Sequence, residues 1–303
     1  MKYFVADAHC DTLYARTREG KDAQRCQVSA DKMARGGMML GTFALWPGTE
    51  PPSQLFYEVA MGSLDESARL DIPIYKALPD TVPESPGGVL SVEGGEAFMG
   101  DMRLLGEFLD AGVKMIALTH NRENELGYPA LGGDTRGLKP FGREVMREMN
   151  RRGVLADVSH LNIAGFWEVM ELAEIPPVAS HSNARALCDH PRNLTDEQIK
   201  AIVARGGFIG INFFSSFLVE RGEATLSDVA RHIDRIAQLG GISCLGLGSD
   251  FDGIGRWPEG LDGAEKFPLL LDFLERWGYK PDDLAAIAGI NLWNLYKLAE
   301  ARA

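Results

Sequence analysis

Residues 3–11 read Tyr-Phe-Val-Ala-Asp-Ala-His-Cys-Asp, a short apolar run that closes on acids and a histidine. Its composition is that of a buried β-strand. Seven further runs of this kind follow, and longer segments with helical period separate them. The eight predicted strands are residues 3–9, 38–45, 89–93, 115–120, 154–160, 177–181, 208–214 and 244–250. Such alternation is typical of parallel strands joined by crossover helices.

The segments between and after the strands predict the helices. They are residues 54–70, 101–111, 141–152, 163–173, 195–205, 226–239 and 267–277, followed by 281–288 and 292–301 with Gly289 between them. Thr195, followed by Asp196 and Glu197, has the features of an N-cap. We predict an α/β fold, a single (β/α)8 TIM barrel with two extra C-terminal helices. An open doubly wound sheet is the alternative. We find no repeat or low-complexity linker, so we expect residues 1–303 to form one domain.

Composition narrows the class of protein. The 303 residues contain 31 Lys and Arg against 43 Asp and Glu, a formal charge of -12, which argues against a nucleic-acid partner. Every apolar stretch is shorter than the ~20 residues that cross a bilayer, so no membrane partner is expected. The first residues lack the apolar core of a secretory signal. The four cysteines have no C-x-x-C spacing, so we expect reduced thiols in a cytoplasmic protein.

Histidines and acids cluster at the carboxyl ends of the predicted strands. The first strand leads into Asp7-Ala8-His9-Cys10-Asp11, and five other strands each end in one such residue. These single residues are Glu93, His120, His160, His181 and Asp250. In a parallel barrel the carboxyl ends converge on one face, where the catalytic groups of this fold lie. We therefore expect one site at that mouth.

Five of these residues have the chemistry of a metal site. The two-residue spacing puts His9 and Asp11 on one side of the strand, where both can bind one ion. With Glu93, His160 and His181 they give five ligands, more than the three that a single catalytic zinc usually takes from protein. The sequence therefore predicts two zinc ions, with Glu93 able to bridge them. Two such ions would hold a hydroxide that attacks a substrate, so the predicted reaction is hydrolysis.

Two further strand-end residues are candidates for the chemistry. Asp250 is placed to accept a proton from metal-bound water and to return it to a leaving amine. Asp252 shares its face but precedes Gly253, where an Asp commonly stabilises a turn, so we favour Asp250. His120 is either a structural hydrogen-bonding residue or a donor to the developing oxyanion, and its spacing does not decide between these roles.

Two arginines follow the sixth predicted strand. Either Arg185 or Arg192 can pair bidentately with a substrate carboxylate. The stiff Pro-Arg-Asn setting favours Arg192. The weaker arginine candidates are Arg256 and Arg122. Of the remaining histidines, we expect His232 on the solvated face of a helix and assign no role to the loop residue His190.

These motifs together resemble a known family, the renal (membrane) dipeptidases, which are metallopeptidases among the amidohydrolase-like barrels. Six blocks carry the resemblance, in the family's order, between residues 9 and 253. They are His9-Cys10-Asp11, Val92-Glu93-Gly94-Gly95, Leu118-Thr119-His120-Asn121, Asp157-Val158-Ser159-His160, Ser180-His181-Ser182 through Arg192-Asn193, and Gly248-Ser249-Asp250-Phe251-Asp252-Gly253.

The resemblance implies a (β/α)8 barrel with two zinc ions and a role for each site residue. It implies that His9 and Asp11 bind one ion, that His160 and His181 bind the other, and that Glu93 bridges the two. It also implies that His120 lies near the scissile carbonyl and that Arg192 binds the C-terminal carboxylate of the substrate. Asp250 would transfer the proton. The segment after Asn121 departs from the family's usual Asn and Ala-Asp, which leaves the preferred side chain open. The chain lacks the signals and paired cysteines of the family's membrane form, so we expect a soluble microbial member.

The predicted function is a binuclear zinc dipeptidase that hydrolyses the peptide bond of dipeptides, including ones with a D residue in second place. The alternatives are another amidohydrolase, such as an N-acyl amino acid deacylase or a lactonase, and a metal-binding protein without catalysis. A proton-transfer candidate and a carboxylate-binding arginine argue against the last, since ion storage needs neither. A homodimer is possible, because apolar helix faces can cover a second subunit or the barrel.

Overall fold

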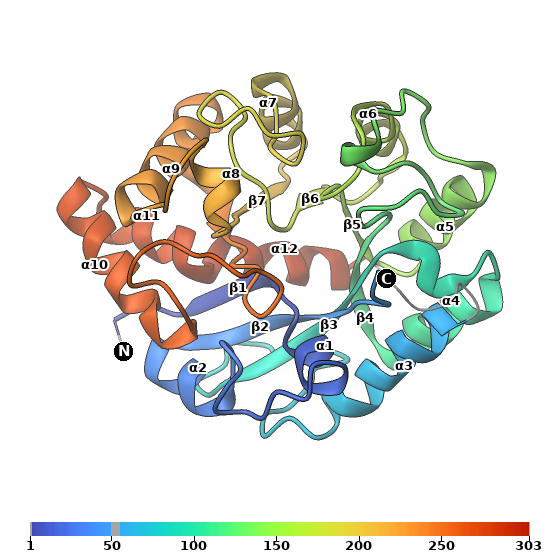
Figure 1. Ribbon diagram of the computed structural model, residues 1–303, viewed down its shortest axis with the longest axis horizontal. Helices are drawn as coiled ribbons and strands as arrows, with labels where there is room; N and C mark the ends of the chain where they lie inside the picture. Colours follow the sequence, from blue (N-terminus) through green and yellow to red (C-terminus); the bar gives the residue numbers. More distant parts are fainter. Residues whose placement is uncertain (1, 50–54, 303) are drawn as a thin grey trace.

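The computed structural model describes residues 2–49 and 55–302, and its strands form a closed barrel (Figure 1). The eight strands are parallel and neighbour one another in chain order. They are β1 (Val5–Cys10), β2 (Met38–Leu45), β3 (Gly87–Glu93), β4 (Val113–Ala117), β5 (Leu155–Asp157), β6 (Val178–Ala179), β7 (Phe208–Ile211) and β8 (Leu245–Leu247). Asp7 pairs with Leu247, which closes the barrel between β1 and β8. The predicted (β/α)8 fold is confirmed and the open sheet is excluded.

Helices surround the strands. They are α1 (Thr12–Thr17), α2 (Ala30–Gly36), α3 (Phe56–Ser67), α4 (Met102–Ala111), α5 (Pro140–Arg151), α6 (Ile163–Leu172), α7 (Asp196–Ala204), α8 (Ser215–Leu218), α9 (Leu226–Gly240), α10 (Phe267–Trp277), α11 (Pro281–Ala285) and α12 (Asn291–Glu300). Helices α4, α5, α6, α7, α9 and α10 agree with the prediction to within one residue at each end. Gln54, the predicted start of the first helix, lies outside the described residues. Thr195 caps α7 in a capping box with Gln198. The sequence did not predict α1, α2 and α8, which have four to seven residues each.

The strands that carry site residues are shorter than predicted. His120, His160, His181 and Asp250 lie two or three residues beyond the ends of their strands, whereas Glu93 is the last residue of β3. His160 has φ 65° and Asp250 has φ 63°, in the left-handed region, which cannot continue a strand ladder. The predicted strands were therefore wrong at these ends, and the site residues lie on loops at the barrel mouth.

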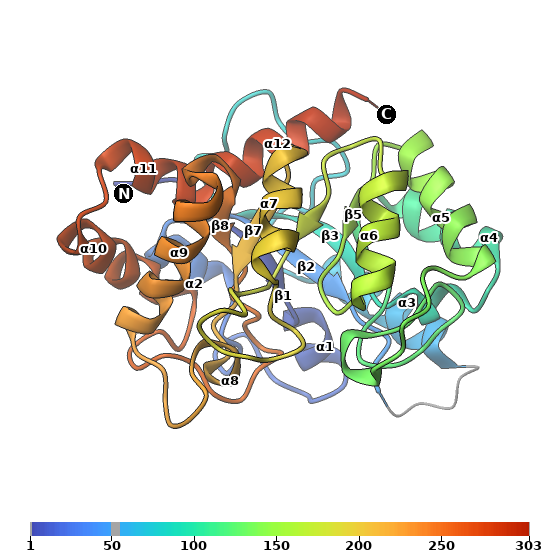
Figure 2. The ribbon, with the colours of Figure 1, turned by 90° about the horizontal axis from the view of Figure 1, so that it is seen from above.

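A helix fills the other end of the barrel. Figure 2 shows α12 across the end opposite to α1 and α8. Leu292 and Tyr296 of α12 pack in one buried cluster with strand residues such as Leu40 and Met115. A π-helical turn, Ala286–Ile290, joins α11 to α12. Gly289 lies within this turn and does not separate two helices, contrary to the prediction. A Cβ on Gly289 would lie 2.7 Å from the Ala6 nitrogen, so glycine allows this turn to lie directly on β1.

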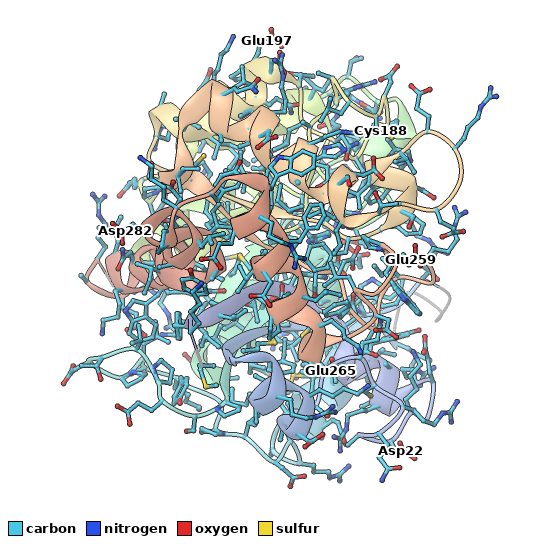
Figure 3. The ribbon with its side chains drawn as sticks, turned by 90° about the vertical axis from the view of Figure 1, so that its left-hand side faces the viewer. Asp22, Cys188, Glu197, Glu259, Glu265 and Asp282 are labelled. Carbon is cyan, nitrogen blue, oxygen red and sulfur yellow. The ribbon has the colours of Figure 1, made fainter. Side chains whose placement is uncertain are left out.

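The outer surface agrees with the acidic composition. Asp22, Glu197 and Asp282 are exposed and lie at the periphery of the molecule in Figure 3. The four cysteines are buried and free, and Cys10 packs among apolar side chains. Within residues 2–49 and 55–302, no helix has both the length and the apolar character needed to traverse a bilayer.

Candidate metal and substrate site

The five predicted ligands meet around one carboxylate at the barrel mouth. Oε1 of Glu93 lies 3.0 Å from Nε2 of His160, 3.5 Å from Nε2 of His181 and 3.7 Å from Nε2 of His9. Oδ2 of Asp11 lies 3.4 Å from His9 Nε2. All five side chains are buried. The geometry thus brings together groups that are up to 172 positions apart in the chain, from His9 to His181.

An irregularity in β1 brings His9 to this mouth. The pairing with β2 slips by one residue between Asp7 and Cys10, so β1 carries an extra residue there. Ala6 and Ala8 pack inside the barrel, while Cys10 packs in the cluster outside it. A β-bulge re-aims the side chains that follow it and is common beside active sites. The bulge therefore places His9 at the mouth without disturbing the packing of its neighbours.

Hydrogen bonds on the far side of two imidazoles set their tautomers. Nδ1 of His160 lies 2.9 Å from Oδ1 of Asn121 and donates to it. Nδ1 of His181 lies 2.7 Å from Oγ of Ser180, whose own hydroxyl donates to Asp157 at 2.5 Å. Each ring nitrogen Nε2 then carries a lone pair, and the two are 3.0 Å apart. Two lone pairs at that distance repel each other unless a cation lies beside them.

The first strand's ligands show the same need for a cation. His9 Nε2 and Asp11 Oδ1 are buried and have no hydrogen-bond partner among the described residues. A Cβ on Gly253 would lie 2.1 Å from Oδ2 of Asp11 and 2.8 Å from Oδ1 of Asp250. Because the backbone of Gly253 is not in the left-handed region, space rather than backbone conformation favours glycine there. The cradle between these acids must stay open.

The charges of the site also favour a cation. Three acids, Asp11, Glu93 and Asp250, are brought together at the mouth. Burial raises the pKa of Glu93 well above its usual range. Burial lowers the pKa of His160 and His181 well below 6.5, so both rings are neutral near pH 7, the form that binds metal. Neutral imidazoles and carboxylates without a thiolate fit zinc.

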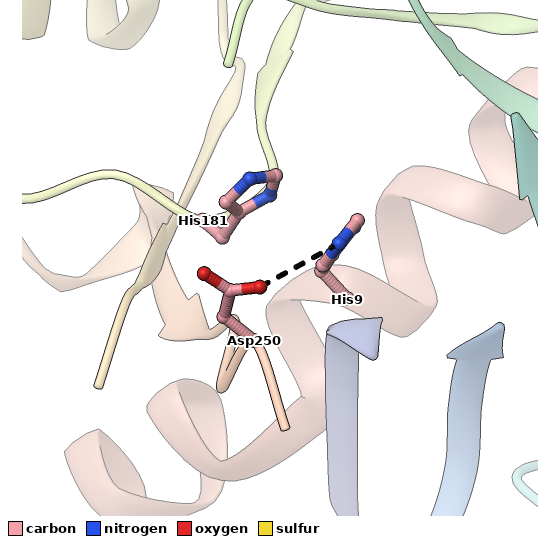
Figure 4. A group of neighbouring side chains, drawn as sticks. All are labelled: His9, His181 and Asp250. Carbon is pink, nitrogen blue, oxygen red and sulfur yellow. Dashed lines mark ion pairs between the residues drawn. The ribbon is translucent and has the colours of Figure 1, made fainter. Parts of the chain in front are cut away.

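Asp250 faces the same centre from the loop after β8. Its Oδ1 lies 3.9 Å from His9 Nε2, and Figure 4 shows both residues converging with His181. Asn212 Nδ2 donates to the other oxygen at 2.9 Å, which fixes the carboxylate's orientation. Burial raises the pKa of Asp250 to about 7. Such a pKa suits a group that accepts and returns a proton near neutral pH.

Asp252 has a different role. Its carboxylate accepts hydrogen bonds from the Thr12 hydroxyl at 2.6 Å and from the backbone nitrogens of Gln27 and Val28 at 2.8 and 3.3 Å. These contacts tie the loop after β8 to the segments after β1. Asp250 lines the cavity at the mouth and Asp252 does not, while proton transfer by Asp250 stays a prediction.

His120 lies in the cavity at the mouth. Its ring centroid is 4.5 Å from that of His160 and 4.9 Å from that of Trp46. Burial lowers the pKa of His120 to about 3, so the ring is neutral. Asn121 Nδ2 lies 3.3 Å from His120 Nε2 and donates to it, which leaves the proton of this ring on Nδ1. One of its ring nitrogens also lies within 4.8 Å of ligand atoms of Glu93 and His160, so the ring borders the same centre as these two residues.

Arg192 is buried beside this cavity, and no described residue forms an ion pair with it. Its Nε and Nη2 have no hydrogen-bond partner among the described residues, and its guanidinium lies 5.5 Å from the Phe217 ring. Burial lowers its pKa to about 10, so it stays charged at pH 7. Arg185 instead pairs with Asp189 at 2.7 Å. A buried cation without a partner is suited to a ligand's anion.

The cavity itself has a volume of about 310 Å³. It is lined by Asp11, Glu93, His120, His160, Arg192 and Asp250, with aromatic and apolar side chains around them. Of the other arginine candidates, Arg256 is exposed and donates to Ser216 at 2.5 Å, and Arg122 is exposed. The structure therefore brings every predicted site residue to one mouth and leaves the weaker arginines outside it.

Some residues escaped the sequence analysis. Asn212 was missed because the sequence analysis considered only histidines and acids at strand ends. It is nevertheless the one polar residue of the seventh predicted strand, residues 208–214. His190 lines the cavity and accepts a hydrogen bond from the backbone nitrogen of Arg192 at 3.2 Å. The prediction for His232 was wrong: it is 1% exposed, because α9 packs it against the backbone of Ala184 and Leu218, which it hydrogen-bonds.

A closed (β/α)8 barrel with histidines and carboxylates at its mouth defines the class of barrel metallohydrolases. The model of the membrane dipeptidase family, peptidase family M19, matches residues 84–303. The chain belongs to this family.

Known proteins of this family are similar along most of the chain. An uncharacterized dipeptidase of Schizosaccharomyces pombe is 32% identical over 250 residues, which are 81% of this chain and 59% of that protein. A second one from the same yeast is 34% identical over 70% of this chain and 52% of its own length. The chain thus spans between half and three-fifths of the length of these curated relatives.

Solved structures share the whole fold. A metallopeptidase from Rhodobacter sphaeroides, crystallised with a phosphinate mimic of the dipeptide L-Ala-D-Ala, has a TM-score of 0.86 and 25% identity, with 97% of this chain and 99% of that chain covered. Dipeptidase AC, a metallopeptidase of family M19, has a TM-score of 0.89 and 25% identity, with 98% and 99% covered.

Proposed function

We propose that this protein is a binuclear zinc dipeptidase, which hydrolyses the peptide bond of dipeptides. The observation that carries the proposal is the convergence of His9, Asp11, His160 and His181 on Glu93, where His9 Nε2 and Asp11 Oδ1 have no hydrogen-bond partner among the described residues. Family membership and the dipeptide mimic bound to the Rhodobacter relative support a dipeptide as the substrate.

The ligands divide into two sets that share Glu93. His9 and Asp11 would hold one zinc ion, and His160 and His181 would hold the other. When bound, two zinc ions supply Lewis-acid activation of a peptide carbonyl and of the attacking water. Asp11, Glu93 and Asp250 together supply three negative charges against the four positive charges of two zinc ions, and Arg192 remains for the substrate.

Arg192 gives the site its preference for a free carboxylate. A dipeptide held by its C-terminal carboxylate at Arg192 has its only peptide bond one residue away, next to the ligand cluster. Arg192 and the ligands line the same cavity of about 310 Å³, a volume at the lower end of the usual range for ligand pockets. We therefore expect dipeptides, including those with a D residue in second place, rather than longer peptides.

Two residues of the chain act on the reacting atoms. Asp250 accepts the proton of the attacking water and passes it to the departing amine, and Asn212 keeps one carboxylate oxygen directed away from that exchange. His120 is neutral and donates its Nδ1 proton to the oxygen of the scissile carbonyl as negative charge develops there. Both residues line the cavity that contains the proposed ligands.

The proposal is tested by zinc content and by a substrate panel. We expect two zinc ions per chain, hydrolysis of dipeptides, loss of activity on complete removal of metal by a chelator, and recovery when zinc is returned. The panel also contains tripeptides, N-acyl amino acids and lactones. Dipeptide hydrolysis that survives without metal would refute the proposal, and preference for N-acyl amino acids or lactones would replace it by the corresponding amidohydrolase. A zinc-loaded protein without any turnover would indicate a binding protein.

The orientation of His181 gives a prediction about metal affinity. In Ser180→Ala the ring loses the hydroxyl that accepts its Nδ1 proton at 2.7 Å, so its lone pair is no longer held toward Glu93. We expect zinc affinity, measured by competition with a chromophoric chelator, to fall by about 10- to 100-fold. Ser91→Ala is the matched control, because Ser91 is also a buried serine but its hydroxyl has no hydrogen-bond partner among the described residues. Equal affinities in the two variants would contradict the prediction.

A further inference from the structure

A second cavity lies beside the first and shares two of its walls. It has a volume of about 450 Å³ and is formed by the loops after β4, β5 and β6 and by the start of α6. We call it the side pocket. His160 and Arg192 line both cavities, so the side pocket begins where the proposed metal and carboxylate sites meet.

The walls of the side pocket are mainly apolar. They include Ala130, Val158, Leu161, Ile163, Ala164 and Leu194. The polar Ser182 and Asn193 are almost fully buried, at 1% and 3% exposure, and Arg192 is 4% exposed with no counterion among the described residues. A ligand that fills this space needs an anionic group for Arg192 and an apolar body for the rest.

The structure assigns the side pocket to the side chain of a dipeptide's C-terminal residue, and points to substrates in which this residue is large and apolar. This inference rests on the proposed function. The carboxylate that pairs with Arg192 and the side chain are bonded to the same Cα, so the side chain must leave from the immediate surroundings of Arg192. The nitrogen on that Cα belongs to the scissile bond, which lies on the His160 side. The N-terminal residue lies beyond that bond, in the first cavity.

The size of the pocket predicts a graded preference. Burial of a Leu or Phe side chain in an apolar pocket stabilises a complex by about 1.5–3 kcal/mol, which corresponds to roughly 10- to 150-fold in kcat/KM. We expect kcat/KM to rise by at least about tenfold from Ala-Gly to Ala-Leu and Ala-Phe. Free phenylalanine, a product of the last, should inhibit competitively and more strongly than free alanine.

The test is a substitution that places a large side chain in the side pocket. Ala164 is half-buried near the start of α6, so Ala164→Phe places a ring in the side pocket without replacing a core residue. We expect the ratio of kcat/KM for Ala-Phe to that for Ala-Gly to fall about tenfold or more, and inhibition by phenylalanine to weaken in parallel. Glu171→Phe is the matched control, because it adds the same ring to an exposed position of the same helix. That variant should keep the wild-type ratio.

The outcomes separate this inference from the proposed function. A wild-type protein that hydrolyses Ala-Gly and Ala-Phe equally well, with a ratio unchanged in Ala164→Phe, overturns the side-pocket inference and leaves the dipeptidase proposal intact. A wild-type protein that hydrolyses no dipeptide overturns the proposed function first. If phenylalanine binding persists unchanged in a folded Ala164→Phe variant, the side chain lies elsewhere and the inference is also overturned.

Discussion

Asp250→Asn is expected to lower kcat by about 10²–10⁴-fold while the protein keeps both zinc ions. The amide cannot take up a proton from water at neutral pH, so the leaving amine is not protonated. The remaining oxygen of the amide can still accept a hydrogen bond from Asn212 Nδ2, as Oδ2 of Asp250 does at 2.9 Å. The orientation of the side chain is therefore preserved. Steady-state kinetics with a dipeptide and zinc analysis on the same sample measure the two effects.

Asp252→Asn is the control for this prediction. Asp252 accepts three hydrogen bonds from the segments after β1, and we expect its replacement to lower the melting temperature and to reduce kcat far less than Asp250→Asn does. Full activity in Asp250→Asn would remove Asp250 from the reaction. A greater loss of kcat in Asp252→Asn at unchanged zinc content would move proton transfer to Asp252.

Gly253→Ala is expected to remove one of the two proposed zinc ions and most of the activity. The added methyl group would lie 2.1 Å from Oδ2 of Asp11 and 2.8 Å from Oδ1 of Asp250, so the Asp11 carboxylate must move away from His9. Displacement of a ligand by about 1 Å is enough to reduce catalysis by about 10²-fold. We expect kcat/KM to fall at least that far and zinc content to fall from two ions to one, as measured by metal analysis after dialysis.

Gly255→Ala is the matched control in the same loop. A Cβ on Gly255 meets no atom within 4 Å, and neither glycine lies in the left-handed region, so the two substitutions differ in the space they fill. We expect Gly255→Ala to retain both zinc ions. If Gly253→Ala also retained two ions and full turnover, the acids around Gly253 would not form the cradle of a metal.

The fold was largely predictable from local patterns. Apolar runs of strand length recur eight times along the chain and alternate with helices, some of which begin at a capping residue such as Thr195. This alternation is compatible with few architectures. Short helices such as α1 and α8 were missed because one or two turns carry too little periodicity to be recognised. Gly289 was interpreted as a break because sequence alone does not show that β1 lies against it.

The candidate site was predictable for a different reason. Parallel strands in a barrel bring their carboxyl ends to one mouth, so any histidine or acid near such an end becomes a candidate. The prediction for His232 was wrong because the burial of this residue depends on loops of other barrel units that pack on α9. Asn212 could have been found by extending the search to amides at the end of the seventh run.

The order of the residues was enough to predict the barrel and the histidines and acids that gather at its mouth, because these follow from periodicity and residue type. Only the folded chain decided the extra residue in β1, the left-handed backbone at His160 and Asp250, and the isolation of Arg192 between two cavities. Each of these features depends on contacts between segments that are far apart in the sequence. No single stretch of the chain determines the energy of such contacts.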